Sequence, residues 1–295
     1  MKKLLATLLT LVLLAGFALP AAAANVNPFA PPANLNELSQ AEQLEYFNLV
    51  VNRVRSERPG FTVRNRHRID TPNMSFTGMV SFLQPIIDHL IQLLMPGYWQ
   101  HRDLLPGQNN QGWFMSENEN ASDLRPEDIT AITAVQQDDN WVIDVRIREE
   151  INPELGLNSS NGRIFSFVTR EEALREISDV APIEANVNNA TMRFHSGYAR
   201  VTVNLQGQVI AGSYGFQVLA QVNDVRIGLG VIAVTTDAII PQVTEVQYTN
   251  FDWTGDRPPF PPAPPMPAPC IHWYSCLPFW LQWILRWVFF GWIWM

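Results

Sequence analysis

The chain has 295 residues and a formal net charge of −8 at pH 7, because 28 aspartates and glutamates outnumber 20 lysines and arginines. Its only lysines are Lys2 and Lys3. The rest of the chain therefore cannot use Schiff-base catalysis, a P-loop lysine or a Ser-Lys dyad. The acidic balance also argues against general nucleic-acid binding.

Residues 1–24 have the pattern of a secretory signal peptide. Lys2 and Lys3 precede an apolar run, and small residues from Ala21 to Ala24 form a cleavage region. A membrane anchor is the alternative, but the apolar run is short and ends in Pro20 and alanines. Cleavage would leave 18 basic and 28 acidic residues, a net charge of −10. No cysteine lies near this site, so we expect no lipid attachment there.

Residues 25–257 are expected to form one secreted α+β domain. Ser39 and Glu42 have the spacing of a capping box, which predicts a helix over 40–56. Four apolar residues of this helix fall on one face: Leu44, Phe47, Val51 and Val54. Pro59-Gly60 ends it, and residues 61–70 are expected to form a strand.

Three arginines share one face of that strand, at positions Arg64, Arg66 and Arg68, and this is the only dense basic region in the acidic chain. One interpretation is a solvated face that pairs with the protein's own acids. The other is a site for an anionic partner, such as a phospholipid head group or a wall polymer.

The segment 75–95 is the most apolar part of the domain and is expected to be helical, with a bend or break at Pro85. Its polar residues recur at helical spacing and form one narrow stripe. It is either a core helix lying across the sheet or the roof of a cavity for an apolar ligand such as lipid. In the second case the candidate lining residues are Phe82, Ile86, Leu90, Leu94, Tyr214 and Phe216.

Residues 97–125 are expected to form a long loop, followed by a helical turn at 126–129 and a strand ending near 137. Alternation over 141–147 predicts a hairpin strand. A further strand is expected over 163–168, and Thr169 with Glu172 predicts a short capped helix ending near Ser178.

The region from Val187 to Trp253 alternates apolar and polar residues, with breaks at 206–208, at Asn223-Asp224 and at Pro241. No room remains for helices between these strands, so their pairing is expected to be antiparallel. The predicted fold class is therefore α+β: a twisted antiparallel meander sheet packed against N-terminal helices, with a C-terminal hydrophobic helix.

Residues 258–269 are mostly proline and are expected to form a polyproline II spacer. Cys270 and Cys276 follow, and in an exported chain we expect them to form a disulfide. Residues 277–295 are apolar except Gln282 and Arg286, and as a helix they would span about 28 Å. Five tryptophans of this tail suit a membrane interface: Trp280, Trp283, Trp287, Trp292 and Trp294.

The tail is expected to span the membrane, to lie in its interface, or to pack on protein. Because no N-terminal lipid is expected, the tail is the predicted anchor. The expected location is the extracellular face of the cell membrane or the cell surface.

No catalytic constellation, metal site or cofactor motif stands out. Adjacent carboxylates occur at 138–139, 149–150 and 171–172, where turns and element ends commonly carry them. The AGSYG stretch at 211–215 lacks the spacing of a nucleophile elbow. An enzyme, such as a hydrolase, is the least favoured class.

Four stretches resemble secreted proteins of unknown function from Gram-positive anaerobes: RPGF at 58–61, NWVIDVRI at 140–147, MRFHSGYARVTVN at 192–204 and VQYTNFDW at 246–253. The architecture also resembles curved-sheet lipoprotein-carrier folds. The four stretches imply no activity, whereas the likeness to carrier folds implies that the sheet holds lipid. Together with the predicted tail anchor, the expectation is a non-enzymatic, membrane-associated surface protein that holds an apolar ligand. The competing expectation is a cell-surface interaction or structural protein with a filled core.

Overall fold

The computed structural model describes residues 27–85, 88–89, 97–110, 113–115, 122–180, 183–184, 186–229 and 232–255. Its α-helices include α2 (Gln40–Glu57) and α4 (Arg170–Val180), and residues 84–85 and 88–89 are also α-helical. The 3-10 helices are η1 (Leu35–Glu37), η2 (Thr71–Asn73), η3 (Gly78–Leu83), η4 (Pro126–Asp128) and η5 (Val187–Asn189). The strands are β1 (Gly60–Ile69), β2 (Ser75–Phe76), β3 (Gln100–Leu104), β4 (Ile129–Gln137), β5 (Asn140–Ile147), β6 (Glu150–Ile151), β7 (Ile183–Glu184), β8 (Ala190–Asn204), β9 (Val209–Leu229) and β10 (Ile232–Asp252).

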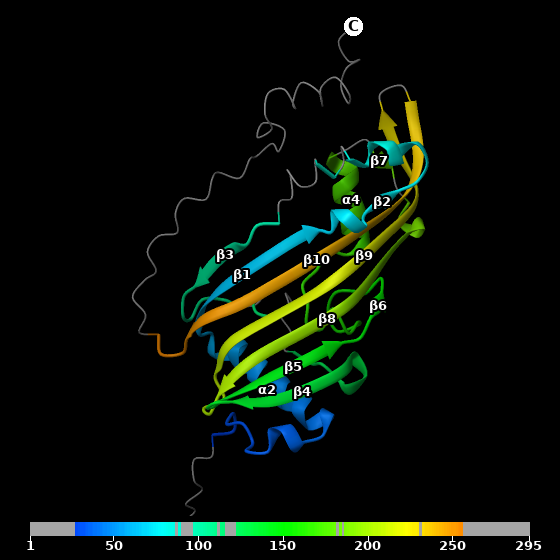
Figure 1. Ribbon diagram of the computed structural model, residues 1–295. Helices are drawn as coiled ribbons and strands as arrows, with labels where there is room; N and C mark the ends of the chain where they lie inside the picture. Colours follow the sequence, from blue (N-terminus) through cyan, green and yellow to red (C-terminus); the bar gives the residue numbers. More distant parts are fainter. Residues whose placement is uncertain are drawn as a thin grey trace, which may run out of the picture.

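These strands form one ten-stranded sheet with the order β3-β1-β10-β9-β8-β5-β4, while β2, β6 and β7 pair with β10, β8 and β9 (Figure 1). All the recorded strand pairs are antiparallel. The prediction of an α+β fold with a large antiparallel sheet is confirmed. The predicted C-terminal helix, the spacer at 258–269 and the signal peptide lie outside the described residues.

The central strands are longer than the sequence breaks predict. Asn223-Asp224 lies inside the 21-residue strand β9, and Pro241 lies inside the 21-residue strand β10. Asp224 has a positive φ of 55°, and the pairing register with β10 shifts between Thr236 and Ala238. The expected turn is therefore a β-bulge, which bends the strand without ending it.

Pro241 fits inside β10 because the neighbouring edge strand changes at this point. Gln242 is the last partner of β1, and Ile239 pairs with β2. Pro241 lies between these two positions, where neither β1 nor β2 has a residue paired with β10. Its missing N–H therefore removes no hydrogen bond between strands. Its carbonyl still accepts a hydrogen bond from the Asp70 amide at 2.8 Å.

One face of the sheet, called the inner face below, carries the main core. Helix α2 packs on it through residues predicted for this role, including Phe47, Val51 and Val54. The capping box is confirmed, because the Ser39 amide donates to the Glu42 carboxylate at 2.9 Å and the Glu42 amide donates to Ser39 Oγ at 3.3 Å. Arg58, in the left-handed conformation, ends the helix.

The helix expected over 75–95 is wrong at its start, whereas residues 84–85 and 88–89, at and after the expected break at Pro85, are α-helical. Residues 75–76 form β2, and Gly78–Leu83 is a 3-10 helix. Thr77 is tied to β10, since its amide donates to the Asp237 carbonyl at 3.0 Å, and Gly78 has a φ of 62° that interrupts a right-handed helix. The strand expected over 163–168 is also wrong, because these residues form a turn and a loop.

Candidate functional site

The face of the sheet opposite α2 is called the open face below. In Figure 1, α2 lies on one side of the sheet, and the broad central strands β8, β9 and β10 present their other side without it. Residues on this side alternate with the core residues, as in β8, where Ala199, Val201 and Val203 are buried and Arg200 is exposed. The three predicted arginines Arg64, Arg66 and Arg68 alternate with Asn65 and His67 along β1.

The β1 arginines form the first cationic cluster of the open face. The Arg66 and Glu245 side chains lie 3.2 Å apart as an ion pair between β1 and β10. The Arg64 and Arg66 guanidiniums lie 5.2 and 5.4 Å from the centre of the Trp99 ring, so two cations contact the same indole. Within the described residues, Arg64 and Arg68 have no carboxylate partner.

Gly97 brings the Trp99 segment close to β1. Its φ is 65°, and an added Cβ would lie 3.0 Å from Arg68 Cβ. Tyr98, next to it, is 77% exposed. The Trp99 ring thus borders the cationic cluster. The long loop expected over 97–125 is wrong in part, because Gln100–Leu104 form β3 next to β1.

A second cationic cluster lies on β5 and β8. Asp144 accepts from Arg200 Nε at 2.7 Å and lies 2.9 Å from Arg146 Nε, so one carboxylate serves two guanidiniums. The Arg146 guanidinium also lies 5.5 Å from the centre of the Tyr198 ring. Burial and the Glu245 carboxylate raise the pKa of Tyr198, which therefore stays neutral and able to donate a hydrogen bond at pH 7.

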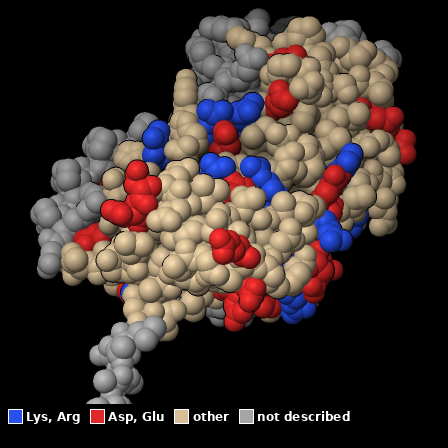
Figure 2. All heavy atoms as spheres, turned by 60° about the horizontal axis from the view of Figure 1, so that its bottom comes forward, with Lys and Arg blue, Asp and Glu red and all other residues tan. Residues whose placement is uncertain are grey.

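Cationic and acidic side chains are intermingled over the surface seen in Figure 2. This agrees with the interpretation that arginines pair with the protein's own acids, as Arg66 and Arg193 do. The two clusters differ from a balanced surface because each has more guanidiniums than carboxylates. The pairing interpretation therefore accounts for only part of the open face.

The predicted ligand-lining residues Tyr214 and Phe216 lie on the inner face and are buried. The Phe165 ring centre lies 5.4 Å from that of Tyr214 and 5.0 Å from that of Phe216. The Phe194 ring stacks on Phe216 at 5.5 Å. Side chains of the protein itself therefore occupy the surroundings of both residues.

The other lining candidates belong to the 75–95 segment. Phe82 is part of the 3-10 helix η3. Ile86, Leu90 and Leu94 lie outside the described residues, and so do the tail tryptophans and both cysteines. No helix within the described ranges is both long and apolar enough to cross a membrane.

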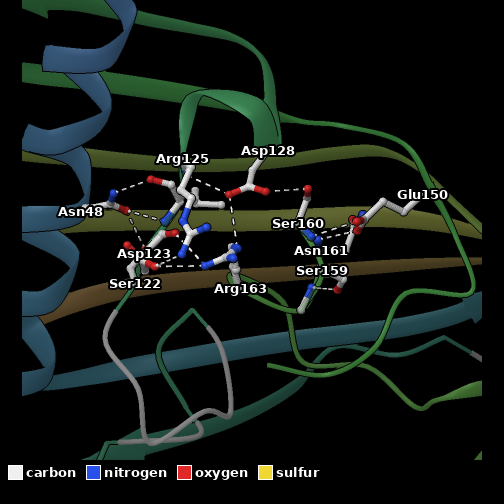
Figure 3. Close-up of polar contacts among 12 residues, drawn as sticks. Asn48, Ser122, Asp123, Arg125, Asp128, Glu150, Ser159, Ser160, Asn161 and Arg163 are labelled. Carbon is white, nitrogen blue, oxygen red and sulfur yellow. Dashed lines mark hydrogen bonds and ion pairs between the residues drawn. The ribbon is translucent and has the colours of Figure 1, made fainter. Parts of the chain in front are cut away.

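The densest polar cluster on the α2 side of the sheet is shown in Figure 3. Asp128 is 5% exposed, and its carboxylate accepts from Ser160 Oγ at 2.7 Å and from the Arg125 amide at 2.8 Å. The Arg163 Nε atom lies 3.3 Å from the same carboxylate. Glu150 accepts from the amides of Ser160 and Asn161 at 2.9 and 2.7 Å.

This cluster joins the 122–125 and 159–163 loops to each other, and the 122–125 loop to α2. Asn48 of α2 donates to the Leu124 carbonyl at 2.8 Å, and Asn52, one turn later, donates to the Ser122 carbonyl at 3.0 Å. The carboxylates of Asp128 and Glu150 both accept hydrogen bonds from backbone amides, and Asp128 also pairs with Arg163. Their partners assign them a structural role, because a general acid or base needs a lone pair or proton free for substrate.

The other adjacent carboxylates lie in a turn, pair with an arginine or cap a helix. Asp138 forms the β4–β5 turn with a φ of 53°. Glu149 pairs with Arg193, Glu171 pairs with Arg170, and Glu172 caps α4 through the Thr169 amide at 3.0 Å. Within the described ranges, no three His, Cys, Asp or Glu side chains are grouped to hold a metal ion.

Asp144, Arg146 and Arg200 occupy polar positions in alternating segments, and this alternation predicts that they face outward. It did not reveal that β5 and β8 are neighbours, so the shared carboxylate was missed. Searches of family models, curated proteins and solved structures gave no match for this chain. Function is therefore inferred from the chemistry of the open face.

Proposed function

We propose that the chain is a non-enzymatic binding module that holds an anionic glycan, such as a wall polymer, on the open face of its sheet. The observation that carries the proposal is the excess of guanidiniums over carboxylates beside Trp99 and Tyr98. Within the described residues, Arg66 pairs with Glu245, and no ion pair joins Arg64 or Arg68 to a carboxylate. In a chain of net charge −8, such a local excess of positive charge favours an anionic partner.

The neutral groups of the open face support a glycan as the partner. Gln247 and Ser213 lie between the two cationic clusters, and both can donate and accept hydrogen bonds. Exposed aromatic rings such as Tyr98 can pack against the apolar C–H face of a sugar ring. An open sheet face that crosses several strands suits an extended chain better than a compact ligand.

The apolar-ligand alternative needs room between the inner face and the segment that covers it. Phe165 and Phe194 occupy the surroundings of Tyr214 and Phe216. This supports the filled-core interaction protein over the lipid carrier. We also propose that residues 1–24 direct export of the protein, and that residues 270–295 attach it to the extracellular face of the cell membrane.

The test is binding of the full-length protein to polyglucuronate, a linear carboxylated polysaccharide, with neutral dextran as the comparison. The double variant Arg64→Gln/Arg68→Gln should weaken binding at least tenfold, because it removes the two arginines without a carboxylate partner. The control Arg125→Gln/Arg175→Gln removes the same charge from exposed positions in the 122–128 loop and on α4 and should change affinity less than twofold.

Raising the salt concentration should weaken binding, because exposed charges are screened. The proposal is wrong if the native protein binds polyglucuronate no better than dextran at low salt. It is also wrong if both double variants lose affinity equally, since net charge alone would then explain binding.

A further inference from the structure

The second cationic cluster presents its arginines outward and its carboxylate inward. The Asp144 side chain is 12% exposed, whereas those of Arg146 and Arg200 are 50% and 49% exposed. A ligand approaching the open face therefore meets two guanidiniums before it meets the acid. This cluster lies on β5 and β8, separated from the β1 arginines by β9 and β10.

The pairing register places the two clusters in line. Arg64 stands opposite Gln247, Gln247 opposite Ser213, and Ser213 opposite Arg200. This row runs perpendicular to the strands and crosses three inter-strand steps. Because neighbouring strands lie about 4.8 Å apart, the backbone positions of Arg64 and Arg200 are about 14 Å apart.

The next row of paired residues, parallel to the first, has little side-chain bulk between the two clusters. Arg66 stands opposite Glu245, Glu245 opposite Gly215, and Gly215 opposite Tyr198. An added Cβ on Gly215 would lie 2.8 Å from Tyr198 Cε1, so the Tyr198 ring lies close over the glycine. With no side chain at Gly215, the ring stays against the sheet, and a ligand can pass over it.

We infer that the ligand runs across the strands, from Arg64 to Arg200, and carries negative groups that reach both clusters about 14 Å apart. This inference rests on the proposed function and specifies its ligand as a linear polyanionic glycan that engages two sites. A single anionic group would contact one cluster only. Two linked contacts bind more tightly than either alone, once the chain is long enough to span them.

The experiment measures binding of the full-length protein to linear oligoglucuronates of increasing length. Short oligomers should bind weakly with nearly constant affinity. Affinity should then rise at least tenfold over a narrow range of lengths, where one chain first reaches both clusters. Arg200→Gln should remove this rise, because it takes a guanidinium from the second cluster, and the control Arg175→Gln on α4 should preserve it.

The two-cluster inference is overturned if affinity grows smoothly with length, or if Arg200→Gln weakens short and long oligomers equally. In both cases binding itself persists, so the proposed function stands. Absence of binding at every length overturns the proposed function as well. Tighter binding to vesicles of an anionic phospholipid than to the longest oligomer would overturn the glycan assignment in favour of a membrane surface.

Discussion

Asp128 and Arg163 form the most enclosed ion pair of the polar cluster, since each side chain is 8% exposed. A buried charge that loses its partner is strongly destabilising, because its desolvation is no longer offset. Arg125 and Asp123 belong to the same cluster but are half exposed. The two pairs therefore test how burial changes the contribution of an ion pair.

We expect Asp128→Ala to lower the free energy of unfolding by about 3 kcal/mol, because Ser160 loses its acceptor and the buried Arg163 keeps only the half-exposed Asp123 carboxylate. Arg125→Gln should cost less than about 1 kcal/mol, since its ion pair is solvated. Urea unfolding of the full-length chain at pH 7 measures both values. Equal effects of the two substitutions would contradict the assigned structural role.

At the scale of the element, the start of α2 depends on an ionised glutamate. Hydrogen bonds from the Ser39 hydroxyl and amide hold the pKa of Glu42 below its ordinary value of 4.5. A lowered carboxyl pKa stabilises the folded state above the unfolded pKa. That contribution disappears as the pH falls below 4.5 through the folded pKa.

We therefore expect Glu42→Gln to reduce stability at pH 7 and to have a smaller effect at an acidic pH below the folded pKa of Glu42, where the native carboxyl is itself protonated. The measurement is the urea midpoint of native and variant proteins at both pH values. Glu45→Gln, at an exposed position of the same helix, is the control and should show no comparable pH-dependent difference. A Glu42→Gln effect that is constant with pH would contradict the capping argument.

Local patterns predicted the elements whose determinants are close in sequence. The capping box at Ser39, the turn at Asp138 and the cap at Thr169 each involve residues within a few positions, and each is present. The helix predicted over 75–95 is wrong at its start, because the Thr77 amide donates a hydrogen bond to the Asp237 carbonyl, which is far away in sequence. The second cationic cluster was missed for the same reason, since Asp144 and Arg200 are 56 residues apart.

At the scale of the whole molecule, the proposed anchor makes a prediction about location. We expect deletion of residues 270–295 to release the body into the medium, because no N-terminal lipid is expected and the tail is the proposed attachment. Fractionation of cells expressing full-length and truncated chains measures this. If both chains appear in the medium as soluble monomers, the tail is not the anchor.

The pairing of β1 with β10 constrains the time at which the body can fold. Gly60 of β1 stands opposite Asp252 of β10, so nearly the whole domain separates two neighbouring strands. Closing so long a loop is slow, and β1 lacks its main partner until the last strand of the domain has emerged. During synthesis the domain therefore stays incompletely folded, with β1 and the apolar residues of α2 exposed, until β10 is available. A chaperone that binds such segments would be expected to act until residue 252 is free, and not afterwards.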